Sequence, residues 1–291
     1  MKPPAFRYSR PGSLTDAVRL LAEHGSQAKV LAGGQSLIPL LSMRLAEPGR
    51  LIDINALAEL DYRRADSDGV RIGALARHSA VLADPAVAAR QPLLTAALRH
   101  VAHPAIRNRG TSVGSIVHAD PAAELPAVLS VLGGSITAAS AAGRRTIAAG
   151  ELFAGPLETT LRSDELAVEA FFPALPAHSG TAFAEVSRRH GDYALCGVAV
   201  LVTLDEDLRV RSARAGYLSM AATPQLLELT EPIAGRVYDA DLSPAAEFAA
   251  GALDPEGDIH ASAEYRRQLA RVLTGRTLAE AARKAARGTR E

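Results

Sequence analysis

The segment Leu31-Ala32-Gly33-Gly34-Gln35-Ser36-Leu37 places two adjacent glycines between a short apolar strand and the start of a helix. Glycine lets a ligand approach the backbone closely, and the first turn of a helix offers free N–H groups to an anion. The segment is therefore a candidate phosphate-binding loop, although a plain strand-to-helix turn has the same pattern. It lacks the G-x-G-x-x-G spacing of the dinucleotide-binding fingerprint.

The residues around this loop predict a β–loop–α–β unit that fills the first 55 residues. Ser13 is a suitable N-cap for an amphipathic helix that ends at Gly25. A second helix is expected from Ser36 to Pro48. Leu51-Ile52-Asp53-Ile54 contains two β-branched isoleucines and one leucine, and it predicts a second strand.

Further along the chain, strands are expected at 70–73 and 166–171, with a hairpin across 135–148 and a helix at 122–132. Residues 103–125 form a long, weakly periodic segment, and such segments inside compact domains tend to carry function. The Pro-rich stretch 173–180 predicts a domain boundary near residue 176.

The last third of the chain predicts a smaller α+β domain. Three segments with strand patterns, 181–186, 194–204 and 210–220, predict a three-stranded antiparallel meander. Helices are expected near 224–229 and 244–250. A longer helix is expected around 265–273, where apolar residues recur at helical spacing.

Composition excludes several kinds of site. The chain has 291 residues, with 32 basic residues balanced by 32 acidic ones, so no nucleic-acid or anionic-membrane partner is expected. Cys196 is the only cysteine, which excludes an internal disulfide and a cysteine-ligated iron–sulfur cluster. No signal-like N-terminus and no long apolar run is evident, so a cytoplasmic protein without a membrane span is expected.

Two further segments are candidates for ligand binding. Arg107–Ser115, which continues to Pro126, is rich in small and hydroxyl residues that can wrap a phosphate-bearing ligand. Asp120 and Glu124 can accept hydrogen bonds from a ribose or a ring N–H, but they are equally suited to cap the helix after Pro121. Arg188–Ala194 offers two arginines for a phosphate and Tyr193 for a flat ring, and its alternative is an ordinary charged turn.

Taken together, the three segments resemble the FAD-binding medium subunits of the xanthine dehydrogenase and carbon monoxide dehydrogenase family of molybdenum hydroxylases. The order and spacing agree over about 280 residues. The combination of the Ala32–Ser36 loop with His118-Ala119-Asp120-Pro121-Ala122-Ala123-Glu124-Leu125-Pro126 is far more specific than either part. The other matches are Arg44-Leu45, Leu51–Ile54, the run from Gly110, and Arg188–Ala194 leading into Gly197-Val198-Ala199.

The resemblance implies an α+β fold with a two-lobed FAD-binding domain of the PCMH/vanillyl-alcohol-oxidase-like type. This domain would span residues 1–176, with lobes at about 1–55 and 56–176, and the C-terminal domain would span 177–291. The implied FAD-binding residues lie in five places along the chain. They are Leu31, Ala32, Gly33, Gly34, Gln35, Ser36 and Leu37; Thr111, Ser112, Val113, Gly114 and Ser115; Asp120; Leu161 or Leu166 beside the isoalloxazine ring; and Tyr193 against it.

Two details bear on the cofactor. Val113 stands where the family commonly has glycine, which implies either a backbone at negative φ or weaker flavin binding. Gln35 replaces the residue types that attach flavin covalently, so non-covalent FAD is expected. No residue is assigned a catalytic role and no metal site is expected, because flavin reduction by single electrons needs no acid or base from this chain.

The function implied by the resemblance is electron transfer within a complex. A large subunit with molybdopterin would hydroxylate a substrate, and a small subunit with two [2Fe–2S] clusters would pass the electrons to FAD in this chain and then to an external acceptor. A dimer of heterotrimers is expected. The alternatives are a stand-alone flavin oxidase or dehydrogenase, and a non-catalytic scaffold that has lost FAD.

Overall fold

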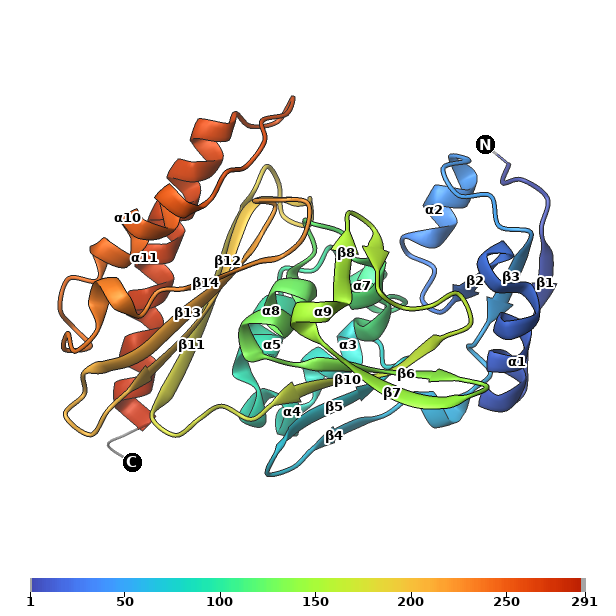
Figure 1. Ribbon diagram of the computed structural model, residues 1–291, viewed down its shortest axis with the longest axis horizontal. Coiled ribbons are helices and arrows are strands. Elements are labelled where there is room, and N and C mark those ends of the chain that lie inside the picture. Colours follow the sequence, from blue (N-terminus) through green and yellow to red (C-terminus); the bar gives the residue numbers. More distant parts are fainter. Residues whose placement is uncertain (1, 289–291) are drawn as a thin grey trace.

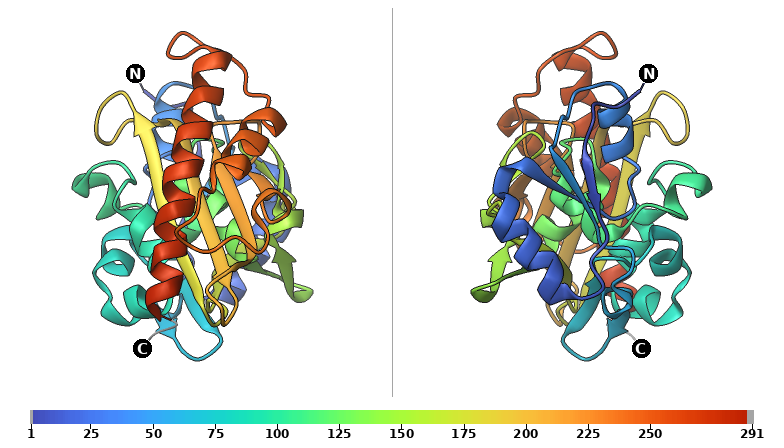
Figure 2. Two further views of the ribbon diagram at one scale, coloured as in Figure 1. Left: turned by 90° about the vertical axis from the view of Figure 1, so that its left-hand side faces the viewer. Right: turned by 90° about the vertical axis from the view of Figure 1, so that its right-hand side faces the viewer.

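A computed structural model describes residues 2–288 of the chain. An N-terminal lobe, a middle lobe and a C-terminal sheet with its helices follow one another along the longest axis (Figure 1). The end views in Figure 2 show the long C-terminal helix at one end of the molecule and the small N-terminal sheet at the other.

The N-terminal lobe is a three-stranded parallel sheet in the order β1-β3-β2. Parallel neighbours need a crossover connection, and helix α2 lies in the one that joins β2 to β3. Helix α1 lies in the connection from β1 to β2, which have β3 between them in the sheet. The Ser13 hydroxyl caps α1 by accepting a hydrogen bond from the Asp16 amide at 3.1 Å. The elements are β1 (Arg7–Ser9), α1 (Leu14–His24), β2 (Ala28–Leu31), α2 (Leu37–Ser42) and β3 (Arg50–Asp53).

This confirms the predicted β–loop–α–β unit, with one difference in the second helix. Helix α2 ends at Ser42, well before the predicted end at Pro48. The chain turns there because Arg44 adopts a left-handed backbone with φ of 58°, a conformation that ends a helix.

The middle lobe is a five-stranded antiparallel sheet in the order β4-β5-β10-β6-β7. Helices α5, α7 and α8 lie over one face of it (Figure 1). The strands are β4 (Arg63–Ala65), β5 (Gly69–Gly73), β6 (Ser135–Ser140), β7 (Gly143–Ala148) and β10 (Leu166–Pro173), with a small hairpin of β8 (Phe153–Gly155) and β9 (Glu158–Thr159). The helices are α3 (His78–Ala83), α4 (Pro85–Arg90), α5 (Pro92–Leu98), α6 (Pro104–Arg107), α7 (Ser112–His118), α8 (Glu124–Leu132) and α9 (Ala149–Leu152).

The weakly periodic segment 103–125 contains regular structure. Two short helices, α6 and α7, occupy much of it. The Thr111 hydroxyl caps α7 by accepting a hydrogen bond from the Gly114 amide at 3.2 Å. A helix of this length has too few turns to show a clear hydrophobic period in the sequence.

The C-terminal sheet has four antiparallel strands, and the predicted number of three was wrong. The strands are β11 (Ser179–Ser187), β12 (Ala194–Leu204), β13 (Val210–Leu218) and β14 (Gln225–Glu228) in that order. β14 lies where a helix was predicted near 224–229. It pairs with β13 from Arg214↔Glu228 to Tyr217↔Gln225, and Leu227 packs against the apolar core while Leu226 is exposed, as in a strand.

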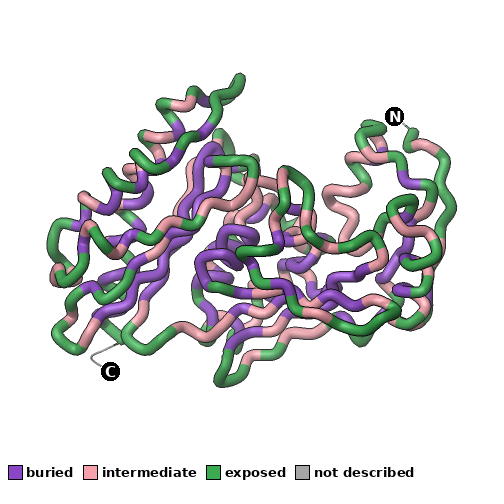
Figure 3. The backbone as a smooth tube through the Cα atoms, viewed as in Figure 1, coloured by how far each residue is buried: buried purple, intermediate pink, exposed green. Residues whose placement is uncertain are grey.

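The central strand of this sheet joins the middle lobe to the C-terminal helices. All residues of β12 are buried (Figure 3). Helix α11 (Ala263–Gly288), with α10 (Ser243–Ala252) beside it, covers one face of the sheet, and α8 of the middle lobe packs on the other. A strand covered on both faces needs an uninterrupted apolar run, which is what residues 194–204 supply.

Within residues 2–288, no helix has the length and apolar character needed to cross a bilayer. The same residues contain no cluster of three His, Cys, Asp or Glu side chains able to hold a metal ion. Cys196 is buried in β12, where burial raises the pKa of its thiol to about 12.

Candidate functional site

The glycine loop is a row of unpaired backbone donors. Gly34 has a φ of 71°, which turns the chain sharply after β2. The Gln35 side chain holds this turn by donating to the Gly33 carbonyl at 3.0 Å. No acceptor among the described residues pairs with the amides of residues 33–37. Such a row of N–H groups before a helix is suited to a phosphate.

The second segment begins where the glycine loop ends. A Cβ on Gly33 would lie 2.5 Å from the carbonyl oxygen of Arg109 and 2.7 Å from the Cα of Gly110. Only glycine permits this contact, because a Cβ at that distance collides with backbone. The two backbone turns, one from each lobe, therefore meet at one place.

A polar network holds this contact, and sequence reasoning missed its residues. Asn55 follows β3 and donates to the Ala32 carbonyl at 2.9 Å. Arg77 donates to the Asn55 side chain at 2.6 Å and to the Arg109 carbonyl at 2.5 Å. The carboxyl ends of parallel strands form the usual ligand edge of such sheets, so a polar Asn directly after the predicted second strand was the available signal.

Within residues 111–115, some side chains are buried and others keep surface that a ligand can reach. The side chains of Thr111 and Ser112 are buried; the Ser112 hydroxyl lies 3.3 Å from Nδ1 of His78, and Thr111 caps α7. Gly114 and Ser115 keep exposed surface. Contacts of this segment with a ligand would therefore come mainly from its backbone and from Ser115.

Val113 does not disturb the backbone of this segment. It lies in the first turn of α7 and is 1% exposed, packed in the middle-lobe core together with Ile116. Helical residues have negative φ. The sequence left two consequences open for a valine at this position, a backbone at negative φ or weaker flavin binding. The structure shows a backbone at negative φ.

Asp120, Glu124 and Tyr193 lie close together beside the second segment. Asp120 accepts a hydrogen bond from the Ala122 amide at 2.9 Å, so it caps the turn that leads into α8. The Tyr193 side chain is 68% exposed. Burial around its hydroxyl, with the carboxylates of Asp120 and Glu124, raises the pKa of Tyr193. The hydroxyl end thus points to the acidic residues, while much of the ring remains open to a ligand.

The position of Tyr193 is set by contacts between the domains. The Ser219 amide donates to the Pro121 carbonyl at 2.8 Å, and the Ser219 hydroxyl donates to the Ala194 carbonyl at 2.6 Å. Ser219 therefore links the segment after Asp120 to the residue after Tyr193. Sequence reasoning missed Ser219.

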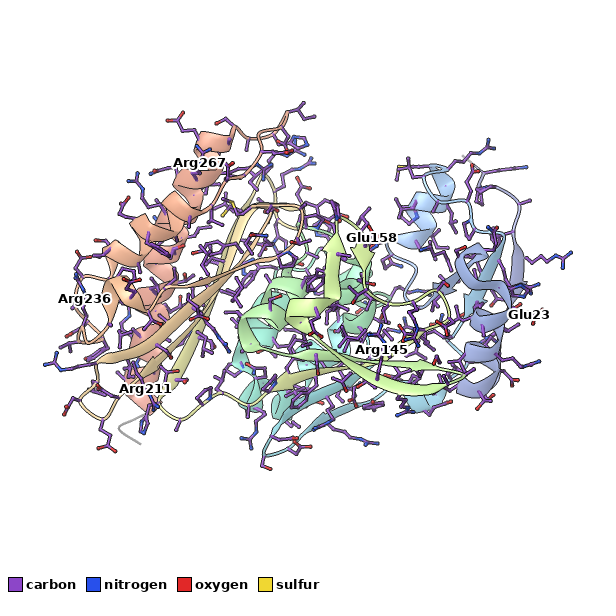
Figure 4. All side chains as sticks on the ribbon, in the orientation of Figure 1. Glu23, Arg145, Glu158, Arg211, Arg236 and Arg267 are labelled. Carbon is purple, nitrogen blue, oxygen red and sulfur yellow. The ribbon has the colours of Figure 1, made fainter. Side chains whose placement is uncertain are left out.

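The two leucines expected beside the flavin ring differ in exposure. Leu166 is 3% exposed and pairs with Ala139 of β6 inside the middle-lobe core, which leaves it little surface for a ligand. Leu161 is half-buried in the preceding loop. Arg145, labelled in Figure 4, holds this loop by donating to the Thr160 carbonyl at 2.9 Å and to Glu165 at 2.7 Å.

A separate groove of about 650 Å³ lies on the C-terminal helices, lined by residues such as Glu247, Tyr265 and Arg271 of α10 and α11. None of its lining residues belongs to the glycine loop or to the 110–120 segment. It has no part in the site described above.

Comparison with known proteins agrees with this geometry. Residues 4–175 match the family described as the FAD binding domain in molybdopterin dehydrogenase, and residues 181–281 match the CO dehydrogenase flavoprotein C-terminal domain. The chain belongs to the FAD-binding medium subunits of the molybdenum hydroxylases. This confirms the resemblance and the two-part α+β fold expected from the sequence.

Relatives of this medium subunit cover nearly its whole length. The 6-hydroxypseudooxynicotine dehydrogenase complex subunit alpha of Paenarthrobacter nicotinovorans is 43% identical over 100% of this chain and 99% of its own. Caffeine dehydrogenase subunit beta of a Pseudomonas species is 40% identical over 97% and 96%. In the structure of quinoline 2-oxidoreductase from Pseudomonas putida 86, a chain 37% identical superposes with a TM-score of 0.92 over 98% and 99%.

Proposed function

We propose that the chain binds FAD without a covalent bond, in the angle between the N-terminal and middle lobes. The amides of Ala32–Ser36 would hold the pyrophosphate, and the backbone of Gly114 and Ser115 would add a second set of contacts. Asp120 would lie near the adenosine ribose or the diphosphate. Tyr193 and Leu161 would lie beside the isoalloxazine ring. The unpaired amides of residues 33–37 support this assignment, because they have no other acceptor in the described chain.

The bound flavin would carry electrons between partner subunits and an external acceptor. The electrons would come from a small subunit with [2Fe–2S] clusters and a large subunit with molybdopterin, in a cytoplasmic dimer of heterotrimers. The residues 1–176 would form the FAD-binding domain and 177–291 the C-terminal domain. The complex-subunit names of the relatives support a partnered protein. The buried single cysteine supports placing the clusters elsewhere.

One observation carries the proposal: the contact of Gly33 with the Arg109–Gly110 backbone. We expect Gly33→Ala to separate the two turns and lower the flavin content of the purified protein at least tenfold. Gly12→Ala is the matched control, because a Cβ at Gly12 meets no atom within 4 Å. Flavin is measured from its absorbance after acid release. Full FAD content in the Gly33→Ala protein would contradict the proposal.

The two alternative functions have less support. A stand-alone oxidase needs acid–base groups over the flavin that act on its own substrate. Neither the sequence nor the geometry assigns such a role to any described residue between 173 and 220. A scaffold without FAD rested on Val113, which the helical backbone at that position accommodates.

A further inference from the structure

The loop that carries Tyr193 packs on a histidine ring of the middle lobe. Gly191 in this loop has a φ of 85°. A Cβ on Gly191 would lie 2.5 Å from Cε1, 2.7 Å from Nε2 and 2.9 Å from Nδ1 of His103. Because the three distances are nearly equal, the glycine lies over the face of the imidazole ring. The ring of His190 lies edge to face with the same imidazole, at 5.9 Å between centroids.

Hydrogen bonds within the loop keep its shape. The Asp192 amide donates to the Arg189 carbonyl at 3.1 Å, and the Ser187 hydroxyl donates to the same carbonyl at 2.9 Å. The Arg189 side chain donates in turn to the Asp192 carboxylate at 3.1 Å. A loop braced in this way moves as one piece, so a contact at Gly191 also sets the position of Tyr193.

The position of His103 is fixed by the helix that follows it. His103 directly precedes α6, and its carbonyl accepts the amides of Ile106 at 2.9 Å and Arg107 at 3.0 Å. The Arg107 side chain donates to the carbonyls of residues 101 and 102 at 2.8 Å each. The ring under Gly191 is therefore attached to an ordered backbone.

Helix α6 lies between two glycine contacts of the proposed flavin site. At its start, His103 contacts Gly191 in the loop of Tyr193. After its end, the backbone of residues 109 and 110 contacts Gly33 in the glycine loop. A Cβ on either glycine would collide with these atoms. One short helix thus sets the position of the loop proposed for the pyrophosphate and of the loop proposed for the isoalloxazine ring.

We propose that His103 is a positioning residue, whose ring supports Gly191 and thereby holds Tyr193 against the isoalloxazine ring of FAD. This inference depends on the proposed function and deepens it. Tyr193 is 68% exposed, so its own packing does not fix it. Ser219 holds the residue after Tyr193, and His103 holds the loop before it. Without the histidine ring, the tyrosine would move away and leave the flavin open to solvent.

Flavin fluorescence reports the position of Tyr193, because a tyrosine stacked on the isoalloxazine ring quenches it by electron transfer. We expect His103→Ala to raise the fluorescence per bound FAD about threefold, with an unchanged melting temperature. His103→Phe keeps a flat ring under Gly191 and should retain the wild-type fluorescence. His260→Ala, at an exposed histidine of the C-terminal domain, is the control.

A glycine substitution tests the other side of the contact. Gly191→Ala should raise the fluorescence as much as His103→Ala, because its Cβ displaces the loop from the ring. Gly235→Ala is the matched control, since Gly235 also has a positive φ, of 71°, but a Cβ there meets no atom within 4 Å. The double variant His103→Ala/Gly191→Ala should show no further increase, because both changes remove one contact.

The FAD content of each protein and the fluorescence of Tyr193→Ala separate this inference from the proposed function. Wild-type protein without FAD, or unchanged fluorescence in Tyr193→Ala, contradicts the proposed function. Increased fluorescence in Tyr193→Ala beside wild-type fluorescence in His103→Ala overturns the role of His103 alone. Additive increases in the double variant, or increased fluorescence in His103→Phe, overturn it as well.

Discussion

His78 is a buried base that stays neutral in the folded protein. Burial lowers its pKa to about 4, with a further contribution from Arg107. Because the unfolded value is near 6.5, the unfolded chain binds a proton more readily once the pH falls below about 6.5. The contribution of His78 to stability is therefore present above pH 6.5 and is lost as the pH falls toward 4.

We expect urea unfolding at pH 5 to show about 2 kcal/mol less stability than at pH 7.5 on account of this residue. His78→Asn should remove this part of the pH dependence, at some cost to stability at both values. His260→Asn, at an exposed position, is the control. An unchanged pH dependence in His78→Asn would show that the histidine titrates normally.

Asn55, which follows β3, contacts the glycine loop directly and the second segment through Arg77. Asn55→Ala removes the hydrogen bonds to the Ala32 carbonyl and to Arg77. At about 1 kcal/mol each, their loss should weaken FAD binding roughly 10- to 100-fold. Fluorescence titration of the flavin-free protein measures this. Asn108→Ala changes an exposed asparagine and should bind FAD like the wild type. Equal affinity of the two variants would refute a role for Asn55.

At the scale of elements, the contact of β11 with α11 depends on a glycine. A Cβ on Gly180 would lie 2.1 Å from the Ala281 carbonyl oxygen and 2.4 Å from the Ala285 amide nitrogen. Gly180→Ala should push the helix from the sheet and destabilise the protein by about 2 kcal/mol. Gly251→Ala, in an exposed turn of α10 with no atom near the new Cβ, should be neutral or stabilising. Thermal unfolding compares the two, and equal melting temperatures would contradict the close packing.

Most of the longer helices and strands were predicted from the sequence, and one short strand was not. Strands β2, β3, β10, β11, β12 and β13 and helices α1, α10 and α11 were predicted, because each has a clear period or an uninterrupted apolar run. Residues 225–228 were misread, because four residues are too few to distinguish a strand from a helix. The pairing of Arg214 with Glu228 decides the matter, and it joins residues that no local pattern connects.

At the scale of the whole molecule, the proposed relay requires metals in other chains. The chain produced alone should bind FAD but neither iron nor molybdenum. The protein purified with its partner subunits should contain both metals. Elemental analysis of the two preparations measures this. Iron in the chain produced alone, or full substrate-oxidising activity without partners, would favour the stand-alone oxidase.

The sequence by itself determined the strand–glycine–helix order at residues 28–42, the apolar central strand at 194–204, and the absence of cysteine ligands. These properties depend only on the types of residues and on their neighbours along the sequence. Only the tertiary structure decided that Gly33 contacts Arg109 and Gly110, that Asn55 and Arg77 join the two turns, and that Ser219 links the segment after Asp120 to the residue after Tyr193. Those contacts join residues far apart in the chain, and they depend on how two lobes and a sheet pack together, which no periodicity along the sequence records.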